Sequence, residues 1–164
     1  MKKSFLIFSL FLIIGCTTSK TYLKRGDFDI ATDKSIEKLR HHPTNQKNIE
    51  VLENAYPKAN QKDLEKIEFL KKEGKPENWE VIYKLYWNLK RRQNKVSELP
   101  DLYRETTGGK LIFDKTNYDD EILNSQQKAA EYLYAHSLTL IAKGDRFSAR
   151  TAFDELEKVK SYYP

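Results

Sequence analysis

The chain has 164 residues, of which 39% are hydrophobic and 32% are charged, and its mean hydropathy is -0.74. This length suits one domain or a short array of repeats, and the polar average requires the apolar residues to gather on particular faces. Without Lys2 and Lys3, which belong to a predicted leader, 27 basic residues stand against 24 acidic ones. That balance is too mild to indicate a nucleic-acid-binding protein.

Residues 1–15 have the pattern of an export leader. Two lysines begin the leader, an apolar run follows, and a small glycine comes just before Cys16. The apolar run has about half the length of a membrane-spanning helix, which argues against a permanent span. The sequence IIGC at residues 13–16 resembles the lipobox of bacterial lipoproteins. The resemblance implies that the leader is removed and that Cys16 becomes the lipid-bearing N-terminus.

Cys16 is the only cysteine of the chain. An exported protein enters an oxidising compartment, where cysteines usually occur in pairs. A lone cysteine at the cleavage site is explained if its sulfur carries a lipid. The alternative is an ordinary buried cysteine or one that leaves with the leader. We expect lipidation at Cys16 and no disulfide in the fold.

The residues after Cys16 bear on its destination. Thr17 stands where lipoproteins retained in the inner membrane often carry aspartate, and the following TTSKTYLKRG lacks the acidic cluster of some surface-export signals. By resemblance to these sorting signals, we expect a lipid anchor in the outer membrane of a Gram-negative bacterium, facing the periplasm. The predicted divisions are a signal peptide at 1–15, a short lipid-anchored linker at 16–22 and a helical domain at 23–164.

Apolar residues recur every three or four positions through most of the remaining chain, which predicts an all-α fold. Residues 46–76 have the length of a helix pair, with Pro57 interrupting or kinking the first helix and Gly74 near the end of the second. Residues 77–105 are predicted to form another pair. The helix that starts at Trp79 is apolar on two sides, so we expect it to pack between neighbours.

An irregular loop is predicted around residues 106–121. It contains two adjacent glycines, which allow unusual backbone angles, and residues 111–113 are too short a run to distinguish a strand from a buried loop. Helical periodicity then resumes, with Asn124 as a candidate N-cap. The last helix is predicted to bury one stripe of apolar residues: Ala149, Phe153, Leu156 and Val159.

Two segments of the chain look alike. They are KRGDFDIATDKSIEKLRHHP at residues 24–43 and AKGDRFSARTAFDELEKVKSYYP at residues 142–164. Each contains Gly-Asp, then an alanine five residues after the glycine, then a helix predicted to close at a proline. Glycine supplies the turn between antiparallel helices, the small alanine lets them approach closely, and proline stops the second helix.

These positions resemble the tetratricopeptide repeat family, whose units are helix pairs of about 34 residues. The matching residues are Gly26, Asp27, Phe28, Ala31 and Pro43 in the first segment and Gly144, Asp145, Ala149 and Phe153 in the second. The resemblance implies an α-solenoid of stacked antiparallel helix hairpins; the alternative is an irregular helical bundle. The end of the array at Pro164 has three alternatives. The last helix caps the array itself, a partner covers the end of the array, or the domain is incomplete and the protein continues.

The sequence lacks the patterns of common catalytic and cofactor sites. It contains no glycine-rich dinucleotide motif, no P-loop and no GxSxG motif. His41 and His42 are adjacent at a predicted helix end and His136 stands apart, a spacing that does not suit a metal site. Residues 119–121 are acidic and either cap a helix or bind a cation, capping being the commoner role. We therefore expect no catalytic residues, no metal and no cofactor.

The candidate binding surface lies on the helix that starts at Trp79. Its members are Tyr83, Trp87, Lys90, Arg91 and Arg92. The basic residues either form a solvated helix end that the helix dipole favours or clamp an acidic peptide, a phosphate or anionic lipid headgroups. The aromatic residues either belong to the core or line a wall that binds an extended peptide or a sugar.

The function that fits these features is a lipid-anchored, non-catalytic adaptor for a protein partner in the cell envelope. The anchor would hold the domain at the membrane and raise its effective concentration near other envelope proteins. The alternative is a glycan-binding lipoprotein at the cell surface, which the absence of an acidic export signal disfavours. An envelope enzyme would need catalytic residues that the sequence does not contain.

Overall fold

The computed structural model describes residues 18–163, so Cys16, the leader and Pro164 lie outside the described part. Its elements are α1 Ser19–Arg25, α2 Phe28–His41, α3 Gln46–Glu73, the 3-10 helix η1 Pro76–Asn78, α4 Trp79–Ser97, α5 Asp119–Ile141 and α6 Arg146–Tyr162. The predicted all-α class is confirmed. The β pairing in the described residues is one isolated bridge between Tyr103 and Lys110.

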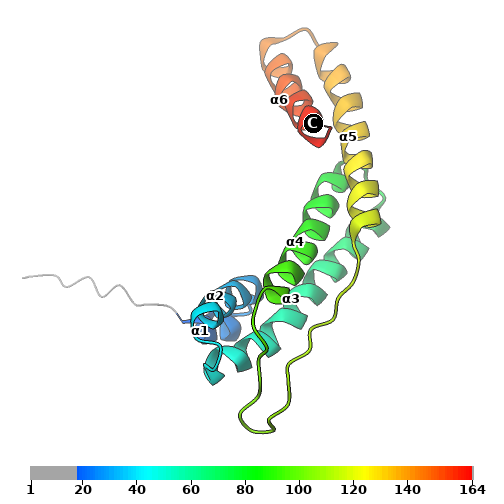
Figure 1. Ribbon diagram of the computed structural model, residues 1–164. Helices are drawn as coiled ribbons and strands as arrows, with labels where there is room; N and C mark the ends of the chain where they lie inside the picture. Colours follow the sequence, from blue (N-terminus) through cyan, green and yellow to red (C-terminus); the bar gives the residue numbers. More distant parts are fainter. Residues whose placement is uncertain (1–17, 164) are drawn as a thin grey trace, which may run out of the picture.

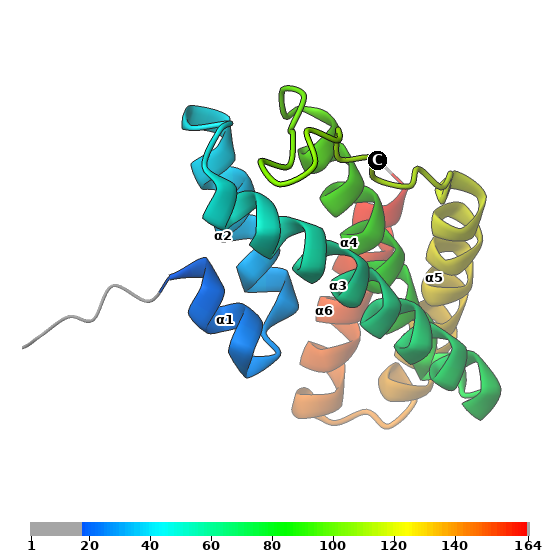
Figure 2. The same cartoon turned by 90° about the horizontal axis from the view of Figure 1, so that it is seen from below.

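Each helix packs against the next one along the chain, and α1 also packs against α3. Figure 1 shows a curved row, with α1 and α2 at one end, α3 and α4 in the middle, and α5 and α6 at the other end. In the view turned by 90° (Figure 2), the long α3 crosses the face of the row and α6 lies next to α5. The curvature places α2 and α6 on either side of one surface of α4, which we call the inner side.

Residues 46–76 do not form the predicted helix pair. They form the single 28-residue helix α3 and part of the short connection that follows it. Pro57 lies inside α3 on its exposed side, and buried residues continue along one face before and after it. No glycine interrupts this face before Gly74, which takes the left-handed conformation at φ +67 and ends the helix.

The predicted pair at residues 77–105 is also one helix, α4, followed by a loop. The helix ends at Ser97, and Pro100 prevents its continuation because proline lacks a backbone N–H. The irregular segment therefore runs from residue 98 to residue 118, which is longer than predicted and starts earlier. Within it, Leu111 is buried and Ile112 is 83% exposed, so residues 111–113 form a partly buried loop.

Helix α5 starts five residues before the predicted N-cap. Asn124 lies inside the helix, and the three acidic residues at 119–121 form its first turn. Negative charge at a helix N-terminus interacts favourably with the exposed backbone N–H groups, which explains this start. Helix α1 likewise begins inside the predicted linker at 16–22, because Ser19 is already helical.

The core consists of three clusters that join consecutive helices. The first joins α2, α3, the end of α4 and the loop through residues such as Leu39, Leu52 and Leu111. The second joins the C-terminal half of α3 to α4 and α5. The third is a small cluster in which Ala31 of α2 meets Val51 and Ala55 of α3, with α1 packed against it. Burial of these apolar side chains is the main source of stability.

The two Gly-Asp segments each form a turn between helices, but they bury different residues. Gly26 and Gly144 have φ of +80 and +72, a conformation in which glycine has no side-chain penalty. Ala31 is fully buried, whereas Ala149 is exposed and Phe153 is 63% exposed. The prediction for α6 is therefore wrong for Ala149 and Phe153, whereas Leu156 and Val159 are half-buried.

Ser148 and Ala152 occupy the buried face of α6 instead. The two helices bury different faces because they have different numbers of neighbouring helices. Helix α2 lies against both α1 and α3, while the described residues place no helix on the side of α6 that carries Ala149. In the first segment, Phe28 is half-buried and Pro43 follows the end of α2.

Candidate binding surface on helix α4

The five residues predicted as a binding surface lie on α4 but do not face one direction. Trp87 is 43% exposed and Arg91 is exposed, whereas Tyr83 and Lys90 are half-buried. Arg92 is only 4% exposed and belongs to the core. The structure therefore brings Tyr83, Trp87, Lys90 and Arg91 together and removes Arg92 from the candidate surface.

Arg92 connects three helices through a buried network. Its guanidinium donates to the Asp63 carboxylate of α3 at 2.7 Å and also to the Asp29 carboxylate of α2 and the Asn60 side chain. Burial raises the pKa of Asp63, although the hydrogen bond and positive charge of Arg92 oppose that rise. Burial disfavours the charged form of Arg92, but the two carboxylates more than offset it and raise its pKa. This network is structural, because the buried charge of Arg92 is paired with carboxylates of two other helices, of which Asp63 is buried and Asp29 is exposed.

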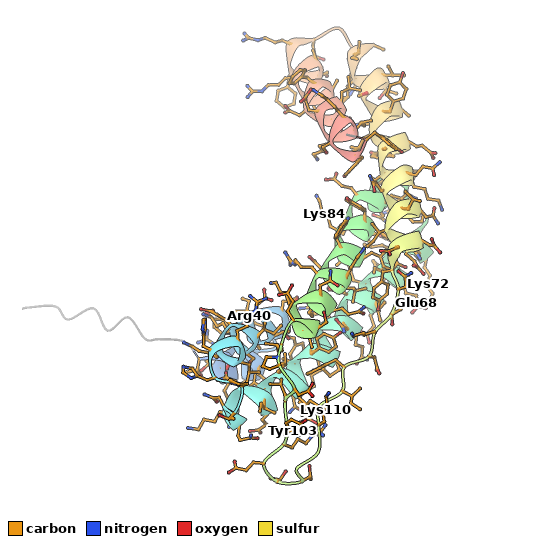
Figure 3. All side chains as sticks on the ribbon, in the orientation of Figure 1. Arg40, Glu68, Lys72, Lys84, Tyr103 and Lys110 are labelled. Atoms are coloured by element: carbon orange, nitrogen blue, oxygen red, sulfur yellow. The ribbon has the colours of Figure 1, made fainter. Side chains whose placement is uncertain are left out.

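The exposed side of α4 carries a shallow hollow of about 370 Å³. Its lining residues are Trp87, Asn88, Arg91, Asn94, Lys95 and Glu98, which we call the Trp87 surface. Trp87, Arg91 and Lys95 recur every four residues and so share one helix face. Figure 3 shows Lys84 projecting from α4 on the inner side of the curve, whereas Glu68 and Lys72 of α3 lie on the opposite side.

The indole of Trp87 contacts the side chains of Tyr83 and Lys90. The Tyr83 ring meets it edge to face with centroids 6.5 Å apart, and Tyr83 in turn meets Tyr162 of α6 at 5.2 Å. The Lys90 ammonium lies 5.5 Å from the centroid of the indole and also pairs with Asp119. Burial raises the pKa of Tyr162 to about 12, helped by the nearby Glu80, so its hydroxyl stays protonated. These contacts fix the position of the Trp87 ring on α4.

The positive charges around Trp87 differ in how far they are neutralised. Lys95 pairs with Asp33 of α2 at 2.8 Å, and Lys84 pairs with Glu80 at 2.6 Å. Arg91 instead donates to the neutral Asn88 side chain at 3.1 Å, and no carboxylate in residues 18–163 pairs with it. Arg91 therefore offers hydrogen-bond donors and a charge to an external group.

The chemistry of this surface suits recognition. A guanidinium binds carboxylates in a planar, two-point geometry, and an exposed indole adds apolar contact and attracts cations.

A second feature, which sequence reasoning missed, holds the loop at residues 98–118. The Gln46 amide donates to the Tyr103 carbonyl at 3.1 Å and accepts from the Glu105 N–H at 3.0 Å. The Gln93 amide makes the same two kinds of bond with Thr116, at 3.2 and 2.9 Å. Each glutamine replaces a missing strand partner, because its amide has the donor and acceptor of a peptide group. No sequence pattern marks these two residues.

Hollows of about 370 and 470 Å³ flank residues 111–114 of this loop, and Ile112 contributes to both. Tyr56 of α3 donates to the Asp114 carbonyl at 3.4 Å, and burial raises the pKa of that tyrosine. Arg104 pairs with Glu53 at 2.5 Å. Figure 3 shows Tyr103 and Lys110 on the projecting part of the loop, at the opposite end of the molecule from α6.

The three histidines do not meet. His41 and His42 are exposed at the end of α2, and Nδ1 of His136 bonds to Glu155 at 2.9 Å. Nowhere in residues 18–163 do three or more His, Cys, Asp or Glu side chains gather as they would around a metal ion. Of the helices described, none combines the length and hydropathy needed to cross a bilayer.

In comparisons with known proteins, no family model, no curated protein and no solved structure matches this chain.

Proposed function

We propose that this protein is a lipid-anchored adaptor of the outer membrane that binds another envelope protein without catalysing a reaction. The observation that carries the proposal is the Trp87 surface, where Arg91 lacks a carboxylate partner among the described residues and stands one turn from a half-exposed indole. The partner segment is acidic, with a carboxylate to meet Arg91 and an apolar side chain to cover Trp87. Such aromatic and arginine anchors contribute much of the binding energy at protein interfaces.

The arrangement of the helices supports this proposal at the level of architecture. Consecutive helices pack against each other, glycines with positive φ close the first and last turns, and Ala31 is buried at the close-packing position. We interpret the fold as a degenerate tetratricopeptide-like stack. Such stacks present extended surfaces on their inner side, where the Trp87 surface lies.

The lipid anchor gives the adaptor its location. A lipid on Cys16 would hold the domain within a few residues of the membrane, because α1 begins at Ser19. Tethering raises the effective concentration of the Trp87 surface near other membrane proteins, so a weak contact suffices for function.

The binding part of the proposal is tested by photocrosslinking in intact cells. A photoreactive amino acid is placed at Asn88 on the Trp87 surface and, as a matched control, at Glu68 on the opposite side of the molecule. We expect a discrete crosslinked protein from position 88 that is absent from position 68. The product should be lost when Arg91→Glu is added and retained when the control Lys72→Glu is added. Equal products from both positions would reject the Trp87 surface as the binding site.

The anchoring part has a separate test. Cells producing the full-length protein or Cys16→Ala are fed a labelled fatty acid, and their membranes are fractionated. We expect label in the intact protein, found in the outer-membrane fraction, and neither label nor processing in the variant. Label that persists after Cys16→Ala would show that another residue carries the lipid.

The alternative function, glycan binding, has its own test. If the protein is retained on an immobilised glycan and Trp87→Ala abolishes that retention, the ligand of the Trp87 surface is a sugar.

A further inference from the structure

Several large apolar side chains are exposed together at the end of the helix row. Tyr134, Leu138 and Ile141 of α5 are 53%, 49% and 51% exposed, and they recur at intervals of four and three residues. On α6, Phe153 is 63% exposed and Ala149 is also exposed. We call these five residues the α5–α6 face. Solvent-exposed apolar groups of this size usually mark an interaction surface when they are contiguous.

The contacts of the two helices show that these residues point the same way. Helix α6 touches α4 through Lys158 with Glu80 and through Tyr162 with Tyr83. At about 100° per residue, Ala149 and Phe153 lie on the far side of α6 from those contacts.

Lys128 marks the side of α5 that faces α4, because its ammonium lies 4.1 Å from the centroid of the Trp79 ring. Ile122 of α5 packs in the cluster with α4, and by helical spacing Tyr134, Leu138 and Ile141 stand at least about 100° around α5 from it, flanking the contact with α6. The α5–α6 face is therefore one surface directed away from α4.

The same chain shows what covers such a surface elsewhere. Ala31, five residues after Gly26, is buried beneath Val51 and Ala55 of the following helix α3. Ala149 stands at the same distance after Gly144 but is exposed. Small residues allow two helices to approach closely, so the chemistry of the face suits another helix.

At one end of the α5–α6 face, the two helices carry opposite charges at the same height. Gln126 bonds to the Tyr162 carbonyl, and His136 bonds to Glu155, which fixes the antiparallel alignment of the two helices. By that alignment, Glu131 of α5 is about level with Lys160 of α6, both are exposed, and Lys160 continues the stripe of Ala149 and Phe153 by helical spacing. A two-fold axis parallel to the helices would place α5 of one copy opposite α6 of the other without changing the height. Glu131 of one copy would then meet Lys160 of the other.

We propose that the α5–α6 face is a self-association surface, on which a second copy of this chain packs with two-fold symmetry. The apolar residues form the centre of the interface, and two symmetry-related pairs of Glu131 with Lys160 form its rim. The proposal is independent of the Trp87 surface, which lies on α4 and would remain free in the dimer to bind a different protein.

Charge reversal provides the decisive test. Two full-length copies with different epitope tags are produced in the same cells and isolated through one tag after solubilisation in mild detergent. Glu131→Lys alone places four positive charges at the rim, and Lys160→Glu alone places four negative charges there. We expect each variant to lose self-association by about tenfold or more, because like charges at an interface are repulsive.

Mixing the two variants restores both pairs. A Glu131→Lys copy and a Lys160→Glu copy should therefore associate with each other while neither associates with itself. Glu50→Lys, an exposed position on α3, is the matched control and should behave like the unaltered protein. Association of the unaltered copies that is unaffected by either reversal would overturn the proposal.

A substitution in the centre of the face gives a second, independent measure. Leu138→Lys is tolerable for folding because the side chain is already half exposed, and circular dichroism verifies that helix content is retained. We expect this variant to be monomeric. The dimer is rejected if the unaltered protein shows no self-association. It is also rejected if Leu138→Lys abolishes contact with a different protein instead, which would mean that the face serves that partner.

Discussion

The two Gly-Asp turns have similar sequences and different surroundings. At residues 26–27 the helix that follows is enclosed by α1 and α3, and its alanine at the fifth position is buried. At residues 144–145 the helix that follows packs mainly on α5, and the corresponding alanine is exposed. The comparison shows that a turn motif determines where the chain reverses. The number of neighbouring helices determines which face of the next helix is buried.

Removing Arg92 should give the largest effect and should act only through the first of these regions. Its network reaches Asp29, two residues after the first turn, and residues 18–163 show no buried ion pair beside the second turn. Arg92→Ala leaves Asp63 buried without its partner, so we expect a loss of about 3 to 5 kcal/mol in the free energy of unfolding. Denaturant titration of the full-length protein in mild detergent would measure it. The exposed pair of Lys84 with Glu80 serves as a control, and Lys84→Ala should change stability little.

The pH dependence of that loss identifies its cause. Burial raises the pKa of Asp63, and the bond and charge of Arg92 are what oppose the rise, so Arg92→Ala raises it further. An acid whose pKa is higher in the folded state stabilises the fold below its unfolded pKa and loses that contribution as the pH rises through the folded value. The deficit of Arg92→Ala should therefore shrink as the pH falls through the raised pKa of Asp63. A deficit that stays constant would exclude the buried carboxylate as its origin.

Enlarging the two alanines tests the comparison directly. Ala31→Leu inserts three carbon atoms between packed helices, and we expect a destabilisation of about 2 kcal/mol. Ala149→Leu should change the stability of the monomer by less than about 0.5 kcal/mol, because its side chain is exposed. Thermal unfolding of both variants under one set of conditions would compare their two losses of stability. Equal losses would mean that another helix already covers Ala149.

Replacing the two turn glycines should instead give equal effects. Gly26 and Gly144 both have positive φ, and an added Cβ would meet no atom within 4 Å at either position. The penalty is then only that of the left-handed backbone, about 1 kcal/mol for each alanine variant. Chemical denaturation would show whether the two losses agree. A much larger loss at Gly26 would indicate that α1 shifts as well.

The smallest expected difference in stability is between variants of the two turn aspartates, Asp27 and Asp145. The Asp145 carboxylate accepts from the Ser148 N–H at 2.9 Å, whereas Asp27 makes no capping bond with its side chain. Asp145→Ala should lower the thermal midpoint by a few degrees and Asp27→Ala should leave it nearly unchanged. The Ser148 bonds lower the pKa of Asp145, so its contribution should be lost as the pH falls through that lowered pKa.

Local features of the sequence could be predicted because their cause is local. Helical periodicity indicated the fold class, and glycines at 26, 74 and 144 marked turns because the left-handed conformation favours that residue. The pair predicted at 46–76 failed because the sequence does not show that Pro57 faces solvent, where the helix tolerates it. Arg92 was assigned to a surface because its partners Asp29 and Asp63 are distant in sequence.

The candidate site could be predicted only in part. Trp87 and Arg91 share a face by their spacing, so their proximity followed from helical geometry. Which of the basic residues retains a free charge depends on carboxylates from other helices, such as Asp33 beside Lys95 and Asp119 beside Lys90. The hydrogen bonds of Gln46 and Gln93 carry no sequence signal at all.

The glutamine contacts have a practical consequence for the loop at residues 98–118. Gln46 and Gln93 bind the backbone on both arms of the loop, and the ion pair of Arg104 with Glu53 is the last contact with α3 before its tip. A short reporter peptide inserted between Thr107 and Gly108 would sit beyond both fastenings, at the other end of the molecule from α6. The protein thus has a built-in attachment point for a fluorophore, from which the Trp87 surface and the α5–α6 face could both be observed without being touched.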